Sequence, residues 1–467
     1  HTLSAEEEAL LNLSSDALEA AHKVYRVLTT ADMKFGKVIK PSSTSDAAPQ
    51  EIELTLANCV THMRNFNRPF RKVVFEKLYD HFGDLENTFS ATLDGQVKKD
   101  VFMAKARKFT SSLACSLHDD VVPESVYLAL IDAVHNSLPQ FYEYVALRKR
   151  MLGVEKLDMY DNYVPIVQDF HMEVSYQQAC QWIREALQPL GPQYMAMIEQ
   201  ALTERWIDIW PNKGKRSGAY SGGCYDSPPY ILTNFENDLD SCFTLAHELG
   251  HSMHTLLSRK GQPYIYSDYR IFVAEIASTT NEALLHDYLL KKAVQDNNWR
   301  LKAYLLNSKC DNFKGTVFRQ TMFAEFELLI HQQVEKGEAL TPDFLCNTYY
   351  DLNAKYFGPE RAASDKRIGK EWMRIPHFYY FFYVFKYATS FSVAEKVSMW
   401  VLNKDSAAID RYLKFLSAGC SLDPLNLLIE HLGVDLTKPE VIADALSGFS
   451  KVVHELSDVL EAHKSDQ

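Results

Sequence analysis

The most constraining feature of this chain is the run His-Glu-Leu-Gly-His at residues 247–251. In an α-helix, residues four apart lie on nearly the same face and about 6 Å apart along the axis. His247 and His251 can then bind one metal ion, and Glu248 lies beside them, within reach of a metal-bound water. The pattern therefore predicts two zinc ligands and a general base for hydrolysis on one helix.

The residues around this run predict a buried helix. Asp240 or Ser241 can cap its start, and Arg-Lys-Gly at 259–261, followed by Pro263, can end it. Apolar side chains cover much of its circumference, at Phe243, Leu245, Ala246, Leu249, Met253, Leu256 and Leu257. A helix that is apolar nearly all round is buried. Histidines inside it need partners, which a metal ion supplies; hydrogen bonds from core histidines to the backbone are the alternative.

A catalytic zinc site keeps three protein ligands and one open position, so a third ligand must be found. His254 is about 10 Å from His247 along the helix axis, too far to share an ion with zinc–nitrogen bonds of about 2 Å. The extended metzincin pattern needs glycine at 254 and histidine at 257, whereas this chain has His254 and Leu257. We therefore expect His254 to pack beside the site or to support a ligand.

The third ligand is predicted on the next helix, which we expect over residues 268–292. Glu275 lies there within the apolar run Phe-Val-Ala-Glu-Ile-Ala. A carboxylate in such a run is rarely buried unless it is paired or binds a metal. Glu282, seven residues further on the same face, is a reasonable partner for a ligating histidine. As alternative ligands, Glu282 ranks second and Asp268 third.

Five segments together resemble a known family: GKRSGAY at 214–220, FTLAHELGH at 243–251, IFVAEIAST at 271–279, GTVFRQTMFAEFE at 315–327 and IPHFYY at 375–380. In this order, and with a match over the whole chain, the sequence resembles oligoendopeptidase F, one of the thimet-oligopeptidase-like zinc metalloendopeptidases. The resemblance implies a mainly α, two-lobed zincin of the gluzincin type. It further implies a small β-sheet beside the H-E-x-x-H helix and a deep substrate channel.

The resemblance also implies chemistry and cofactor. It implies one zinc ion per chain, with His247, His251 and Glu275 as its ligands and Glu248 as the general base. It implies cleavage of short peptides rather than folded proteins. Two departures qualify the match. Relatives carry a further helical segment before the position of His1, and they carry tyrosine and glycine where this chain has Phe385 and Ser390. A phenylalanine in a substrate-facing position would remove one hydrogen bond to the peptide.

We expect two regions along the chain. Residues 1–60 are predicted to be the end of the family's N-terminal region, and residues 61–467 to be the zinc metallopeptidase catalytic domain. Ser4 with Glu7 forms a capping-box signal for a helix reaching about Thr29.

Two further patterns complete this organisation. Residues 37–40 and 51–54 flank a Pro- and Ser-rich stretch, 41–49, and predict a hairpin or exposed loop. Long helices are expected from 58 to 154, with breaks at Gly83, Gly95 and Pro123.

Aromatic residues near the C-terminal third are candidates for catalysis. His377, Tyr380 and Tyr383 recur at a spacing of three, so we expect them to share a helical face. An aromatic stripe is more often part of a core, but the resemblance favours His377 near the substrate. We favour Tyr380 and Tyr383 over Tyr379 and Tyr387 as donors to the oxyanion that develops during hydrolysis.

A Gly-, Tyr- and Pro-rich segment, 218–234, interrupts the helical pattern just before the metal helix and predicts strand and loop. We expect Ser221, Gly222 and Gly223 to form an edge strand that pairs with an extended peptide, main chain to main chain. A structural hairpin that covers the zinc helix is an equally weighted alternative.

The composition argues against two classes of binding partner, nucleic acids and membranes. The net charge of −12 and the sequence pI near 5.8 argue against nucleic-acid or anionic-membrane binding. The apolar run 378–394 is shorter than the roughly 20 residues of a membrane span and contains Lys386. The eight cysteines form no C-x-x-C pair, which is typical of reduced thiols in a cytoplasmic protein.

The predicted reaction is zinc-dependent hydrolysis of internal bonds in short oligopeptides. Glu248 takes a proton from the zinc-bound water and returns it to the leaving amine. The metal, His377 and a tyrosine hydroxyl stabilise the oxyanion. Two rival functions remain: a zinc exopeptidase such as a carboxypeptidase, and a helical binding protein whose H-E-x-x-H run is accidental.

Overall fold

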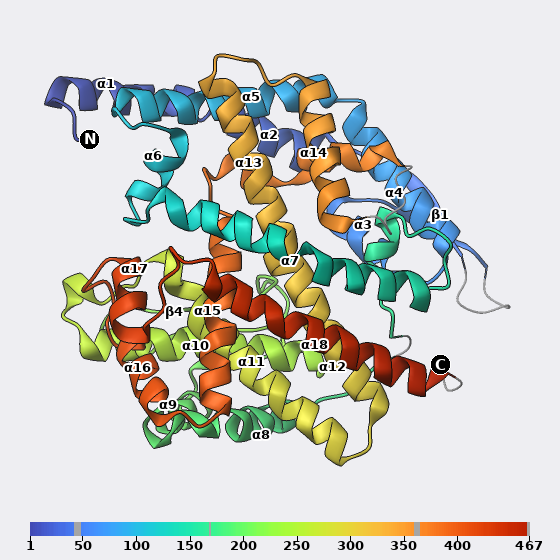
Figure 1. The fold of residues 1–467 in the computed structure, drawn as a ribbon, viewed down its shortest axis with the longest axis vertical. Helices are drawn as coiled ribbons and strands as arrows, with labels where there is room; N and C mark the ends of the chain where they lie inside the picture. Colours follow the sequence, from blue (N-terminus) through green and yellow to red (C-terminus); the bar gives the residue numbers. More distant parts are fainter. Residues whose placement is uncertain (42–47, 168–169, 359–364, 465–467) are drawn as a thin grey trace. The chain divides into compact units, whose positions relative to one another are not determined.

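The computed structural model describes residues 1–41, 48–167, 170–358 and 365–464 (Figure 1). Helices form most of the described chain, and the strands are few and short. This confirms the predicted mainly α fold with a small sheet. The described chain divides into two compact units.

Unit 1 consists of His1–Asp119, Leu138–Ile166 and Arg319–Phe385. Its elements, in chain order, are α1 (Ala5–Leu18), α2 (Ala20–Val27), η1 (Leu28–Asp32), β1 (Lys37–Lys40), β2 (Gln50–Glu53), α3 (Leu56–Met63), α4 (Arg68–Gly83), α5 (Glu86–Ala106), α6 (Ser112–His118), the later part of α7 (Glu124–Met151), η2 (Met159–Asn162), α13 (Arg319–Glu335), α14 (Pro342–Phe357), η6 (Lys366–Arg374) and η7 (Pro376–Tyr379).

Unit 2 consists of Asp120–Ser137, Val167–Phe318 and Lys386–Gln467. Besides the start of α7, it contains α8 (Tyr176–Leu187), η3 (Gln188–Leu190), α9 (Pro192–Thr203), β3 (Ile207–Asp208), β4 (Tyr220–Gly222), β5 (Tyr230–Leu232), α10 (Leu239–Gly261), η4 (Tyr264–Tyr266), α11 (Ile271–Gln295), α12 (Trp299–Asn312), η5 (Phe313–Phe318), α15 (Phe385–Leu402), α16 (Ser406–Leu416), α17 (Pro424–Leu427), η8 (Leu428–Leu432) and α18 (Glu440–Ala462).

The first 60 residues follow their local signals. The Ser4 hydroxyl accepts from the Glu7 amide and the Glu7 carboxylate accepts from the Ser4 amide, so the predicted capping box starts α1. The expected single helix divides at Glu19 into α1 and α2. The predicted hairpin forms by antiparallel pairing of β1 with β2. Most of the Pro- and Ser-rich stretch, 42–47, lies outside the described residues, and the domain division near residue 60 stays a prediction.

The break predicted at Gly95 is wrong. Gly83 ends α4 and α7 begins directly after Pro123, but Gly95 lies inside α5. A Cβ placed at Gly95 would lie 3.2 Å from the Ala21 Cβ on α2. The glycine therefore serves close packing of two helices within unit 1 rather than a turn, a distinction that chain-local signals do not carry.

Within unit 2, a small sheet lies against α10. Its strand order is β3-β5-β4, with β3 parallel and β4 antiparallel to β5. The predicted strand-and-loop character of 218–234 is thus correct. The Ser221 and Ser252 hydroxyls lie 2.8 Å apart and join β4 to α10.

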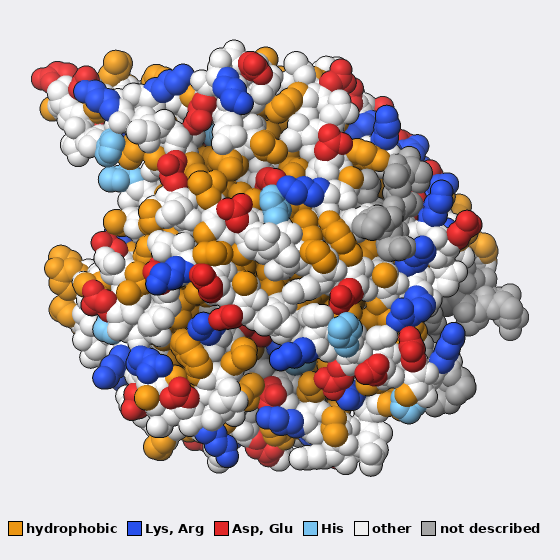
Figure 2. Space-filling model, viewed as in Figure 1, with side chains coloured by type: hydrophobic (Ala, Val, Ile, Leu, Met, Phe, Trp, Pro, Cys, Tyr) orange, Lys and Arg blue, Asp and Glu red, His pale blue; other side chains and the backbone are white. Residues whose placement is uncertain are grey.

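Charge is mixed on the face that Figure 2 shows: acidic and basic side chains are interspersed there, and neither sign forms a continuous patch. Among the described residues, no helix is both long and apolar enough to cross a bilayer.

Candidate active site

The H-E-x-x-H run lies in the middle of α10, as its pattern predicts. The cap differs from the prediction: Asp238 is the N-cap, and its carboxylate accepts a hydrogen bond from the Ser241 amide. Asp238, Asp240 and Ser241 all have capping side chains, and the backbone geometry selects the first. The helix ends at Gly261, with Arg259 and Lys260 in its last turn, as expected.

Helices α10 and α11 pack with their backbones in direct contact at Gly250. A Cβ at this position would lie 2.5 Å from the Ser278 Cα and 2.6 Å from the Ala277 carbonyl oxygen. Such distances exclude any side chain, so glycine is required for this approach. About one helical turn away, the Asn281 side chain donates to the Ala246 carbonyl oxygen at 3.1 Å, and this hydrogen bond fixes the position of one helix along the other.

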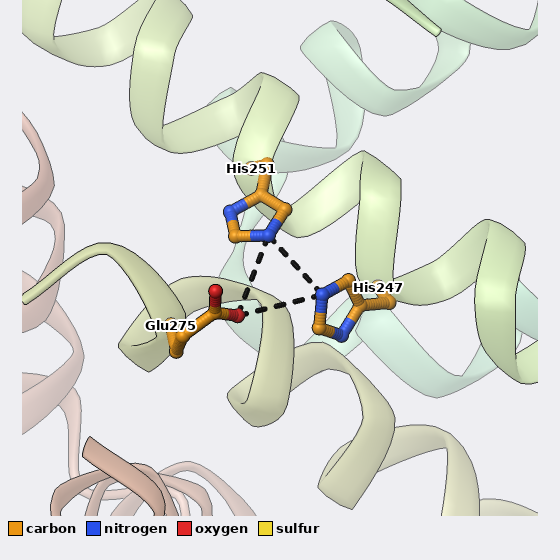
Figure 3. A group of neighbouring side chains, drawn as sticks. All are labelled: His247, His251 and Glu275. Carbon is orange, nitrogen blue, oxygen red and sulfur yellow. Dashed lines mark hydrogen bonds and ion pairs between the residues drawn. The ribbon is translucent and has the colours of Figure 1, made fainter. Parts of the chain in front are cut away.

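This close packing brings His247, His251 and Glu275 together (Figure 3). The two histidine Nε2 atoms lie 3.1 Å apart. The Glu275 Oε2 lies 3.5 Å from His247 Nε2 and 3.4 Å from His251 Nε2. All three side chains are partly buried and point toward one another, two from α10 and one from α11.

Hydrogen bonds orient two of these side chains. The Nδ1–H of His247 donates to the carboxylate of Glu282, one helix away. This places the Nδ1 proton outside the cluster and leaves the lone pair of Nε2 directed into it. The Ser278 hydroxyl donates to Glu275 Oε2 at 3.0 Å.

Electrostatics favour an ionised Glu275. Burial alone would raise the pKa of this carboxyl, but the hydrogen bond and charge of His251, together with His247, lower it to about 2. The neighbouring carboxyl has the opposite shift: burial raises the pKa of Glu248. Glu248 is 6% exposed, and its Oε2 has no hydrogen-bond partner among the described residues. An orphaned acceptor next to two histidines is suited to receive a proton from water.

A cavity of about 480 Å³, here called the site cavity, opens beside these residues within unit 2. His247, Glu248 and Glu282 line it, together with Phe243 and Ala219. Glu248, the predicted base, and one candidate ligand, His247, thus face a molecule that enters the cavity.

His254 packs behind the site, one of the two roles expected for it. It is 1% exposed, and its ring stacks on the Tyr269 ring with centroids 3.6 Å apart. Burial lowers the pKa of His254 to about 3, so the ring is neutral at physiological pH. His254 is not part of the group of possible metal ligands, which among the described residues consists of His247, His251 and Glu275.

The candidate substrate strand β4 lies at the edge of its sheet. Gly222 and Gly223 differ in the room around them. A Cβ at Gly222 would meet only the Tyr220 ring, at 4.0 Å, whereas one at Gly223 would lie 2.6 Å from the Pro228 carbonyl oxygen. Gly223 is therefore required by the loop itself, and Gly222 is not.

His377, Tyr380 and Tyr383 form one aromatic cluster in unit 1, but they do not share a helical face as predicted. Ring centroids lie 5.6 Å apart for His377–Tyr380, 6.4 Å for His377–Tyr383 and 6.5 Å for Tyr380–Tyr383. The 3₁₀-helix η7 ends at Tyr379. Phe381 and Phe382 then adopt left-handed backbone conformations, with φ of 46° and 56°. This strained turn, rather than helical spacing, sets the rings beside one another.

Glu327 stabilises that turn and was missed by sequence reasoning. It is fully buried, and its Oε1 accepts a hydrogen bond from the Phe382 amide at 2.5 Å. Burial raises the pKa of Glu327 to about 7. Its setting, Phe-Ala-Glu-Phe-Glu-Leu-Leu, is a carboxylate among apolar residues, the same signal that identified Glu275.

The two departures from the family pattern have different surroundings. Phe385 is fully buried, so its ring offers no surface to a peptide. The Ser390 hydroxyl donates to the Phe272 carbonyl oxygen at 3.0 Å, which joins α15 to α11.

Comparison with known proteins shows the family of the chain. The family model described as Peptidase family M3 matches residues 61–448, and one described as Oligopeptidase F matches residues 1–35. The chain is 45% identical over 460 residues to oligopeptidase PepF of Bacillus subtilis, covering 98% of this chain and 67% of that protein. It is 41% identical to the group B oligopeptidase PepB of Streptococcus agalactiae, covering 98% of this chain and 74% of that protein.

A solved structure extends the agreement to three dimensions. The crystal structure of oligoendopeptidase-F from Enterococcus faecium superimposes with a TM-score of 0.80 at 36% identity, covering 99% of this chain and 76% of that one. The family model spans well over half of the residues, and the relatives align over nearly all of them. The chain therefore belongs to peptidase family M3 and is a metalloendopeptidase, as the sequence predicted.

Proposed function

We propose that this chain is a zinc-dependent endopeptidase that hydrolyses internal bonds of short oligopeptides, with Glu248 activating the attacking water. The observation that carries the proposal is the convergence of three donor atoms, from His247, His251 and Glu275, beside a buried carboxylate and an open cavity.

The geometry of the donors fits zinc. Ligand atoms about 2.0–2.1 Å from a tetrahedral ion lie about 3.3 Å from one another. The three separations here are 3.1, 3.4 and 3.5 Å. Two imidazoles and one carboxylate form the ligand set of many catalytic zinc sites, which leave one position open. His247, His251 and Glu275 would hold one zinc ion, and Glu282 would orient His247 through its Nδ1–H.

When bound, zinc would acidify a coordinated water and polarise the scissile carbonyl. The chain supplies the proton transfers. Glu248 Oε2 accepts a proton from the attacking water, and burial favours this because it raises the affinity of the carboxylate for protons. Glu248 then donates that proton to the nitrogen of the leaving amine, so the same oxygen serves as base and acid.

We assign His377, with Tyr380 or Tyr383, to the carbonyl oxygen that becomes negatively charged. Burial lowers the pKa of His377, so its imidazole is neutral near pH 7 and carries one N–H, the type of donor that stabilises an oxyanion. Of the two tyrosines, Tyr380 is the more accessible, with 47% of its surface exposed. The family resemblance to oligopeptidases, and not a contact in the structure, supports these roles.

Peptides would bind extended along β4. As the edge strand of β3-β5-β4, it can pair with one further strand through main-chain hydrogen bonds. Pairing of this kind recognises backbone rather than sequence, which suits cleavage of many short peptides in a deep channel. We also propose a cytoplasmic location, because none of the eight cysteines, all of which the structure describes, is in a disulfide.

Two measurements test the function. Metal analysis of the purified protein should give about one zinc per chain, and an internally quenched peptide blocked at both ends should be cut. Glu248→Gln should keep the zinc and lower kcat by about 10³-fold. Glu236→Gln is the matched control, because Glu236 is an exposed carboxylate lining the same cavity. Trimming of free-ended peptides only would indicate an exopeptidase, and near-normal turnover by Glu248→Gln would exclude the mechanism.

A further inference from the structure

A second cavity, of about 220 Å³, adjoins the site cavity in unit 2. The two cavities share two lining residues, Phe243 and Glu282. Glu282 is held by its hydrogen bond to His247. The side chains of Phe243 and Glu282 are here called the partition between the cavities. The ring of Phe243 makes no hydrogen bond, so it is the part of the partition that can be replaced.

The partition follows from the helix pairing. His247 on α10 meets Glu282 on α11. One turn away on both helices, Phe243 faces His286, with ring centroids 6.5 Å apart. Residues four apart occupy the same face of a helix, so the Phe243–His286 pair is the next contact along the same interface between α10 and α11. The ring of Phe243 therefore closes the site cavity on the side away from His251.

In the second cavity, the residue that faces Phe243 is held in place and uncharged. His286 is 7% exposed and its Nε2–H donates to the Leu305 carbonyl oxygen at 2.8 Å. Burial lowers the pKa of His286 to about 4. Lys309 and Glu395, which also line the second cavity, are paired at 3.0 Å. Among the described residues that line this space, the one Lys or Arg is Lys309, so an aromatic side chain that enters would meet no unpaired Lys or Arg.

We infer that Phe243 is a specificity-determining residue: its ring limits the size of the substrate side chain that enters the site cavity beside Glu248, and removal of the ring joins the two cavities. This inference rests on the proposed function. A peptide whose scissile carbonyl lies at Glu248 has neighbouring Cα atoms only 3.8 Å apart. A side chain flanking the scissile bond can therefore reach the site cavity, and Phe243 is the wall it meets.

The inference predicts a change in preference without loss of the catalytic centre. Phe243→Ala opens the second cavity, so bulky aromatic residues gain room at one position flanking the cleaved bond. Phe243→Leu opens it in part. Ala283, on α11, lines only the second cavity. Ala283→Leu fills that space, so it should reverse the effect of Phe243→Ala and have no effect alone.

The test uses peptides blocked at both ends and identical except at one residue flanking the scissile bond, which is Ala, Leu, Phe or Trp. Mixtures are digested in competition and kcat/KM ratios are read by mass spectrometry, with zinc content measured for each variant. We expect Phe243→Ala to raise the Trp-to-Leu ratio at one position at least tenfold, Phe243→Leu to raise it less, and Phe243→Ala/Ala283→Leu to restore the wild-type ratio.

An unchanged profile in Phe243→Ala with intact zinc and activity would overturn the inference, as would a shifted profile in Ala283→Leu alone. If Phe243→Ala does not fold, the Phe243→Leu ratio with and without Ala283→Leu decides the same question. Failure of the proposed function gives a different result, because the wild-type protein would then cut none of the blocked peptides.

Discussion

The Nδ1–H of His247 donates a hydrogen bond to the carboxylate of Glu282 on the adjacent helix. This contact fixes the tautomer and ring orientation of a candidate zinc ligand, and such partners of ligating histidines contribute 10- to 100-fold to metal affinity. We expect Glu282→Ala to weaken zinc binding by about that factor and Glu282→Gln to weaken it less, because an amide oxygen still accepts the hydrogen bond. Titration against a chelator measures both, and Glu236→Gln is the control. Equal zinc affinity in all variants would remove Glu282 from the site.

Gly250 should tolerate no larger residue, because backbone atoms of α11 occupy the space of its side chain. An alanine Cβ there would lie 2.5 Å from the Ser278 Cα, so α10 and α11 must separate. We expect Gly250→Ala to destabilise the protein by about 3 kcal/mol and to lower zinc content, because His251 and Glu275 move apart. Gly448→Ala in α18 is the matched control, since nothing lies within 4 Å of its Cβ position. It should stabilise by up to about 1 kcal/mol. Urea unfolding and metal analysis compare the two; similar midpoints would refute the close contact.

Peptide pairing along β4 can be tested at Gly222. Its Cβ position is open, so Gly222→Val changes the strand edge without straining the fold. We expect KM for a blocked peptide to rise about tenfold, roughly 1.4 kcal/mol of lost binding, with zinc content unchanged. Substitution of Gly223 is unsuitable, because a side chain there would contact the Pro228 carbonyl oxygen whether or not peptide binds. A wild-type KM in Gly222→Val would favour a purely structural hairpin.

Glu327 should make stability depend on pH. Burial raises the pKa of its carboxyl from 4.5 to about 7 in the folded state. Between these values the folded protein keeps a proton that the unfolded chain loses, so the free energy of unfolding falls as pH rises from about 4.5 to 7. The decrease is on the order of 3 kcal/mol.

The neighbouring His331 acts in the same direction. Burial opposes its protonation, but Asp100 raises the pKa of His331, and that contribution is also lost as pH rises through the raised value. Glu327→Gln cannot ionise and should therefore show a shallower decline in unfolding free energy between pH 5 and 8. Urea unfolding across this range measures the slopes. Parallel slopes for the wild type and Glu327→Gln would contradict the shift.

Local signals predicted that His247, His251 and Glu275 lie together; their role as metal ligands stays a prediction. The spacing of His247 and His251 depends only on helix geometry, and Glu275 was identified because an apolar run buries its carboxylate. The structure brings these three residues together. At Glu327 the same signal marks a carboxylate that accepts a hydrogen bond from a backbone amide, that of Phe382. A buried carboxylate thus indicates a partner, but the sequence does not say whether that partner is a cation or an amide.

Features that depend on distant contacts were not predicted. Three-residue spacing suggested a helical face for His377, Tyr380 and Tyr383, whereas the chain turns at Phe381 and Phe382. Phenylalanine rarely adopts positive φ, and here the hydrogen bond from the Phe382 amide to Glu327, 55 residues earlier, helps to hold that conformation. Gly95 was misread for the same reason, since its role lies in contact with α2.

The backbone contact at Gly250 limits how this enzyme can move. Sliding α10 along α11 by a single residue would displace its side chains by about 1.5 Å, enough to separate imidazoles from the carboxylate opposite. The two helices must therefore keep their positions relative to each other during turnover. Any opening that admits a peptide or releases its fragments has to come from other segments, while the pair itself stays locked.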